Sequence, residues 1–387
     1  MRLASAQERP PDADLANTYS DVVPKILGRA IAYLRANSLM PRLANRDYDG
    51  AAAQRGDTIN VPVPPTITTV DVTPGYATTS TTDITLSTTP VTLSYHKEAP
   101  FYLTDKQRRE IMENGEEMAV MSSLASLCDA IDLTILTAMD VGASNAHGTA
   151  GTTPFATLAL ATAPLVTLDV NKAAKGQRRV IMDPLANGNL LGLAGFTSRD
   201  YVGDVTAMTQ GGYNGNVNIG ASWWMSQQCP SHTAGTGASY LVNNGSGIAV
   251  GGTTIACDTG SGTILAGDVV SFAADTTNKY VVATALSGGS FTIASPGVKV
   301  AIPDNNAITV SATHRANFAF DRNAIVFASR PFLPSAANVM MDQVTDPVTG
   351  LTVRLEITRE KKQDRWSLDA LWGTKVVRPE GVVKIMG

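Results

Sequence analysis

Apolar positions predict two helices in the first 141 residues of the chain. An apolar stripe at helical spacing predicts the first helix, between residues 18 and 37. Its members are Val22, Val23, Ile26, Leu27, Ala30, Ile31 and Leu34. A longer helix is predicted from about 105 to about 141, beginning at the capping box Thr104–Gln107. It would span roughly 55 Å at 1.5 Å per residue, which indicates a spine element.

Alternating apolar and polar positions predict strands between and beyond these helices. Residues 57–100 are rich in threonine and predict a long two-stranded excursion with a break at Pro90. Because an isolated two-stranded ribbon is marginal in water, we expect this one to lie on another surface. Further on, residues 178–182 predict a buried strand that ends at Asp183-Pro184, followed by a short helix to about 193.

Residues 230–312 differ in composition from the rest of the chain. Charges nearly vanish, and glycine, serine and threonine dominate. Short strands separated by turn residues predict a small β-barrel or sandwich. Their ranges are 240–242, 254–257, 269–272, 280–285, 291–293 and 308–310. Because the flanking residues look like one α/β unit, we interpret this segment as an insertion.

The C-terminal part predicts further strands. Residues 351–357 and 365–372 alternate clearly, and the charged stretch 358–364 is predicted to be the turn of their hairpin. Shorter strands are predicted at 318–320 and 325–327. Residues 375–385 predict a closing strand pair or an edge strand.

Composition narrows the class of protein. The 387 residues suggest two or three structural units, 44% are hydrophobic and only 17% are charged. The net charge of −4, without a basic cluster, argues against sequence-specific nucleic-acid binding. No run of 18 apolar residues predicts a membrane span, and no signal peptide is expected. Cys128, Cys229 and Cys257 lack paired spacing, which predicts reduced thiols.

The search for chemistry yields no candidate catalytic, cofactor-binding or metal-binding residue. No phosphate-binding loop or nucleophile elbow is present, so no enzyme is predicted. The histidines lack metal-ligand spacing and are expected at surfaces or interfaces. They are His96, His147, His232 and His314. Four scattered acids are expected in turns or helix caps. They are Asp183, Asp200, Asp204 and Asp321.

Three stretches carry a resemblance to a known family. They are Leu265-Ala-Gly-Asp-Val-Val-Ser-Phe-Ala273 with Phe291-Thr-Ile-Ala-Ser-Pro296, then Phe320-Asp-Arg-Asn-Ala-Ile-Val-Phe-Ala-Ser-Arg-Pro331, then Leu368-Asp-Ala-Leu-Trp-Gly-Thr-Lys-Val-Val-Arg-Pro-Glu380. In this order the chain resembles the major capsid proteins of tailed bacteriophages, whose fold is named after phage HK97. It is most similar to the branch with an inserted telokin-like domain, as in short-tailed Salmonella phages.

The resemblance implies an α+β fold with seven segments. They are an N-terminal arm (1–56), an extended β-loop (57–100), the spine helix of a peripheral domain (101–150), a first axial part (151–228), the inserted β-barrel (229–312), a second axial part (313–337) and the peripheral hairpin with the C-terminal strand (338–387). Some relatives cross-link a loop lysine to a neighbour. Here the excursion has no lysine before Lys97, so no such bond is expected.

The implied function is structural. The resemblance implies a subunit that self-assembles, as hexamers and pentamers, into an icosahedral shell around double-stranded DNA, without catalysis. Scaffolding and portal proteins are further implied partners, DNA contact would be non-specific, and no membrane is involved. The implied location is the virion, after assembly in the host cytoplasm. The alternatives are another phage structural protein, such as a tail-tube or decoration protein, and a hydrolase with a β-rich accessory domain.

Overall fold

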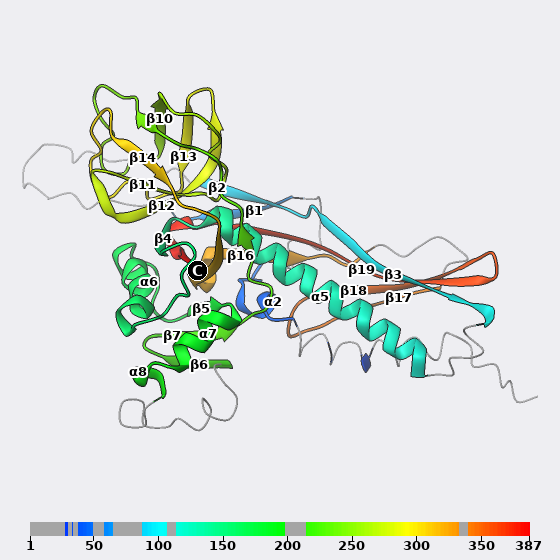
Figure 1. Cartoon of the computed structure of the whole chain (residues 1–387). Helices are drawn as coiled ribbons and strands as arrows, with labels where there is room; N and C mark the ends of the chain where they lie inside the picture. Colours follow the sequence, from blue (N-terminus) through cyan, green and yellow to red (C-terminus); the bar gives the residue numbers. More distant parts are fainter. Residues whose placement is uncertain are drawn as a thin grey trace, which may run out of the picture. The chain divides into compact units, whose positions relative to one another are not determined.

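The structure is a computed structural model that describes residues 28–29, 33, 38–48, 58–64, 87–106, 114–197, 214–332 and 340–387 (Figure 1). It divides into two compact units. One comprises Met1–Asn37, His96–Cys128 and Pro331–Ala370, and the other comprises Ser38–Tyr95, Asp129–Arg330 and Leu371–Gly387. The predicted helix at 18–37 lies outside the described residues except for Gly28, Arg29 and Tyr33, which are helical.

A mixed sheet lies at the centre of the second unit. Its strand order is β4 (Asn145–Gly148), β20 (Val382–Met386), β15 (His314–Asp321), β5 (Arg178–Met182), β7 (Ala221–Met225) and β6 (Asn214–Asn218). The strand predicted at 178–182 is confirmed as β5. The prediction of a closing strand pair or edge is wrong, because β20 lies between β15 and β4. All five residues of β20 are buried, as in a strand covered on both faces.

Three short helices accompany this sheet. They are α6 (Leu158–Val170), α7 (Pro184–Leu191) and α8 (Ala194–Thr197). Asp183 caps α7 by accepting hydrogen bonds from the amides of Leu185 and Ala186, which confirms its predicted capping role. Trp223 is fully buried in the core of this layer, where its ring meets Phe155 and Phe196 edge-on. Aromatic contacts therefore join α8 and the loop before α6 to strand β7.

A closed barrel of six strands is formed by residues 240–310 (Figure 1). The order is β11 (Val269–Phe272), β14 (Ala307–Val310), β9 (Tyr240–Val242), β10 (Thr254–Asp258), β13 (Ser290–Ile293) and β12 (Asp275–Ser287), and β12 pairs again with β11. All six predicted strands are present. The barrel has its own core, in which Phe272, Tyr280 and Phe291 are the largest buried side chains.

The barrel is continuous with the central sheet at one point. Strand β12 pairs with β4, where Tyr280 lies opposite Asn145. The Nζ of Lys279 donates to the carbonyl oxygen of Gly148 at 2.6 Å, next to this pairing. The short strand β8 (Ser231–His232), which leads into the barrel, pairs with the start of β15, which leaves it. Backbone pairing therefore anchors the barrel on two sides.

A two-stranded ribbon is formed by β1 (Thr58–Val63) and β2 (Ser87–Thr92), which confirms the base of the predicted excursion. The excursion's tip, at 65–86, lies outside the described residues. The predicted break at Pro90 is wrong, because Pro90 lies inside β2 opposite Asn60. The ribbon packs on another surface, as expected: its apolar face contacts Val326 and Ala328 of β16 (Ile325–Ser329). The 3-10 helices Arg322–Ala324 and Pro379–Gly381 adjoin this region.

The ribbon lies very close to the backbone of the later part of the chain at Gly373. A Cβ at Gly373 would lie 2.4 Å from the carbonyl oxygen of Thr92, which is backbone and cannot rotate away. We therefore expect Gly373→Ala to lower the free energy of unfolding by about 1–3 kcal/mol, the cost of overpacking. Limited proteolysis should also cut the ribbon sooner. Gly176→Ala, where a Cβ meets nothing within 4 Å, is the control, and equal behaviour of both variants would contradict the prediction.

The first unit contains an antiparallel sheet of long strands. Here β19 (Gln363–Val376), which continues into the second unit, pairs with β18 (Thr352–Glu360) and with β3 (Tyr95–Thr104), and β18 pairs with β17 (Met340–Thr345). The predicted hairpin is confirmed, but its turn is only Lys361-Lys362, both at positive φ. Charged residues that predicted a longer turn continue both strands, and Arg359 pairs with Asp364 across them at 2.8 Å.

The long helix α5 (Asn114–Gly142) belongs to both units. Its predicted end near 141 is confirmed. Residues 107–113 lie outside the described residues, whereas Asp105 and Lys106 are helical. The stretch Met118–Gly142 is long and apolar enough to cross a membrane, but half of its most apolar window is buried inside the protein. Its buried apolar side chains serve packing, as expected for Cys128, which is 1% exposed, whereas Met118 and Leu133 are exposed.

Candidate functional site

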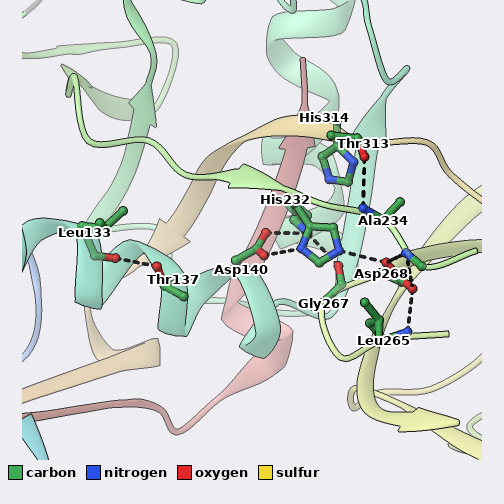
Figure 2. A network of polar contacts seen from close by, with 12 residues as sticks. Leu133, Thr137, Asp140, His232, Ala234, Leu265, Gly267, Asp268, Thr313 and His314 are labelled. Carbon is green, nitrogen blue, oxygen red and sulfur yellow. Dashed lines mark hydrogen bonds and ion pairs between the residues drawn. The ribbon is translucent and has the colours of Figure 1, made fainter. Parts of the chain in front are cut away.

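The structure brings together charged groups that lie far apart in the sequence. Asp140 lies in the last turn of α5, His232 in β8, Asp268 before β11 and Lys384 in β20. Figure 2 shows the imidazole of His232 between the two carboxylates. All four side chains are at least nine-tenths buried. We call these four residues the charge cluster.

Both nitrogens of His232 contact carboxylates. Nδ1 lies 2.7 Å from Oδ2 of Asp140, and Nε2 lies 2.9 Å from Oδ1 of Asp268. A carboxylate only accepts hydrogen bonds, and a neutral imidazole has a single N–H. His232 can therefore donate to both acids only as an imidazolium. Burial alone would lower the pKa of His232, but the hydrogen bonds to Asp140 and Asp268 raise it above its ordinary value.

Lys384 supplies the second positive charge. Its Nζ lies 2.5 Å from Oδ1 of Asp140 and donates to the carbonyl oxygen of Gly267 at 2.7 Å. Burial lowers the pKa of Lys384, and Asp140 opposes that change. Burial would raise the pKa of Asp140, but hydrogen bonds from His232 and Lys384 lower it. With Asp268 also ionised, two negative and two positive charges cancel inside the protein.

The turn before β11 is shaped to fit this cluster. Gly267 has φ +91°, and a Cβ there would lie 2.8 Å from Cε1 of His232. Asp268 accepts hydrogen bonds from the amides of Gly235 and Leu265 as well as from His232. A side chain at position 267 would therefore push the imidazole away from the turn.

A second histidine lies beside the cluster in a different protonation state. His314 pairs with His232 in the β8–β15 register, and the two rings lie 5.3 Å apart. Its Nδ1 donates to the carbonyl oxygen of Ala312 at 2.8 Å. Burial and the nearby Lys384 lower the pKa of His314 to about 4, so this ring is neutral.

The other two histidines lie elsewhere. Burial lowers the pKa of His147 to about 4, and its Nε2 lies 2.5 Å from Oγ1 of Thr167. His96 is about half exposed and lies 2.9 Å from Asp369, which also pairs with Arg354. The expectation that histidines lie at surfaces or interfaces is thus wrong for His232 and His314, which are buried inside the chain. Among the described residues, no group of three His, Cys, Asp or Glu side chains is arranged to hold a metal ion.

A second buried acid holds part of the predicted arm. Oδ2 and Oδ1 of Asp132 on α5 accept hydrogen bonds from the amides of Leu39 and Met40, each at 3.1 Å. These amides begin the short helix α2 (Met40–Leu43). Burial raises the pKa of Asp132 to about 7, although the two amides act in the opposite direction. One titratable group therefore holds the start of this segment, and Arg179 donates to the carbonyl oxygen of Leu43 at its end.

Among the comparisons with known proteins, the one with solved structures identifies a fold. No family model matches the chain, and no curated protein matches its sequence. A solved chain of Mycobacterium phage Che8 matches with a TM-score of 0.52 and 17% identity over 90% of both chains. The chain has a fold found in a bacteriophage. The phage fold predicted from the sequence is confirmed at this level, and the telokin-like nature of the barrel stays a prediction.

Two further solved structures are similar to this chain. One is titled as the capsid structure of the cyanophage P-SCSP1u, with a TM-score of 0.49 and 11% identity over 90% of this chain and 88% of the other. The other is a virus-like particle from Pyrococcus furiosus, with a TM-score of 0.44 and 8% identity over 94% and 98%.

Proposed function

We propose that the chain is the major capsid protein of a tailed phage, a structural subunit without catalytic activity. The observation that carries this proposal is the likeness to the chain of phage Che8, which extends over 90% of both chains. A match over 90% of both chains favours a fold that is shared along the whole chain rather than one shared domain. We further propose the seven segments given above, with the barrel as an inserted domain in a fold of the HK97 type.

The subunit would assemble as hexamers and pentamers into an icosahedral shell around double-stranded DNA. Many modest contacts, closed by symmetry, make such a shell stable. The net charge of −4 suits an inner wall that touches DNA non-specifically, because tight sequence-blind binding needs many cationic contacts. Scaffolding and portal proteins are the proposed further partners, and the virion is the proposed location after assembly in the host cytoplasm.

Electron microscopy of the purified chain tests this function. Closed shells of uniform diameter are expected. Open tubes would indicate a tail-tube protein, and binding only to preformed shells would indicate a decoration protein. Persistent monomers that turn over a substrate would favour the hydrolase alternative and overturn the proposal.

The ribbon offers a sharper test of how the shell would form. Because Val63 lies opposite Ser87, residues 64–86 can be replaced by Asn-Gly as a two-residue hairpin loop that keeps β1 and β2 paired. We expect a chain that folds normally by circular dichroism but forms no shells. A Gly/Ser linker of the original length is the control for length alone and should fail as well. Normal shells from the shortened chain would show that the excursion does not join subunits.

A further inference from the structure

The charge cluster connects three parts of the second unit. Asp140 belongs to α5, Lys384 to the central sheet, and Asp268 to the barrel. His232 lies on the strand that enters the barrel and touches both acids. We call residues 231–235, 265–268 and 311–314 the barrel root.

We propose that His232, held as an imidazolium between Asp140 and Asp268, is a proton-operated latch that fastens the barrel root to the end of α5. Gain or loss of one proton decides whether His232 can donate hydrogen bonds to both acids or to only one. A neutral imidazole would donate to one carboxylate and turn a lone pair toward the other. It would also leave two buried negative charges against one positive charge, which is costly in a buried site.

The groups around His232 favour it as the residue whose charge changes with pH. Both acids stay negative near neutral pH, because their pKa values are lowered. Lys384 lies 2.5 Å from Asp140, which opposes the lowering of the Lys384 pKa by burial. His314 is neutral there and keeps its hydrogen bond to Ala312. Arg315, the next residue on β15, is exposed to solvent. His232 is the group that contacts both acids, and its charge changes as the pH rises from slightly acidic to alkaline.

The direction of the effect follows from the raised pKa of His232. Its contribution to stability is complete below 6.5, the ordinary histidine value, and is lost as the pH rises through the higher folded value. The β12–β4 pairing does not depend on this proton, so the barrel should loosen at its root without detaching. The opening should be local, because the barrel has its own core.

Hydrogen exchange of the full chain, followed by mass spectrometry between pH 6 and 9, tests the latch. As His232 deprotonates, peptides covering 231–240 and 262–270 should exchange faster, after correction for the pH dependence of intrinsic exchange. The exchange rate should rise about tenfold for each pKa unit of stabilisation that is lost. Peptides from the central sheet should not. His232→Gln should show low, pH-independent protection at the root. His314→Gln is the matched control and should keep the dependence on pH.

A second measurement covers the case in which His232→Gln fails to fold. Carbon-13-labelled histidine in the unchanged chain reports each ring's titration by NMR. The proposal predicts one ring that stays protonated above pH 6.5 and is absent from the spectrum of any folded His232 variant. A His232 that titrates at or below its ordinary value, or root protection that does not change with pH in the unchanged chain, would overturn the latch.

Discussion

Lys384→Met is expected to lower the free energy of unfolding by about 3–5 kcal/mol, the range found when one partner of a buried ion pair is removed. The Lys384 side chain is 0% exposed and lies 2.5 Å from Asp140. Without it, two carboxylates share the one positive charge of His232. Urea unfolding followed by tryptophan fluorescence measures the loss.

Two variants make this prediction specific. Lys175→Met removes a lysine that is 81% exposed and pairs with Asp169, so it should change stability little. Adding Asp140→Asn to Lys384→Met restores neutrality, because Asp268 and His232 then remain as one balanced pair. The double variant should therefore recover part of the lost stability. If Lys384→Met behaves like Lys175→Met, the cluster does not stabilise the fold.

Asp132→Asn is expected to make the chain more stable than the unchanged protein above pH 7. The pKa of Asp132 rises from 3.8 to about 7 on folding. Its contribution is therefore complete below 3.8 and lost as the pH rises through about 7. The change amounts to about 4 kcal/mol at 1.36 kcal/mol per pKa unit. Asparagine keeps a side-chain oxygen for the amides of Leu39 and Met40 without acquiring a charge.

Urea titrations at several pH values between 4 and 8.5 measure this effect. The two proteins should agree near pH 4 and diverge by pH 8, and amide exchange at Leu39 and Met40 should follow the same course. Thr137→Ala, on the exposed side of the same helix, changes no titratable group and is the control. A constant difference between unchanged and Asp132→Asn protein at all pH values would contradict the assignment. The pH range in which Asp132 loses its contribution to stability ends at about 7. The range in which His232 loses its own contribution begins close by, above 6.5.

Local patterns predicted local structure well. The six barrel strands were found because each is short, apolar and followed by turn residues. Strand β5 and the end of α5 followed from the same kind of signal. The prediction of a closing strand pair or an edge strand is wrong because nothing in Val-Val-Lys-Ile-Met tells which strands flank it. Pairing of β20 with β4 and β15 depends on contacts far away in the sequence.

The charge cluster was missed for the same physical reason. His232 and Asp140 are separated by 92 residues, and His232 and Asp268 by 36, so no spacing rule connects them. One signal was present: Lys384 interrupts an otherwise apolar strand, and a lysine in such a place requires a buried partner. The sequence could therefore indicate that a partner exists, but not that it is Asp140.

Pro62 and Pro90, the two prolines in the strands of the ribbon, affect how its edges can pair with other chains. Pro90 lies opposite Asn60, and Pro62 lies opposite Thr88, so the prolines occupy ladder positions of the same kind on the two strands. A proline has no N–H to donate, which suits positions whose N–H would point outward. Each outer edge of the ribbon thus lacks one backbone N–H that a strand of another chain would need as a hydrogen-bond donor. The free chain therefore has less risk of joining edge to edge with other chains into aggregates.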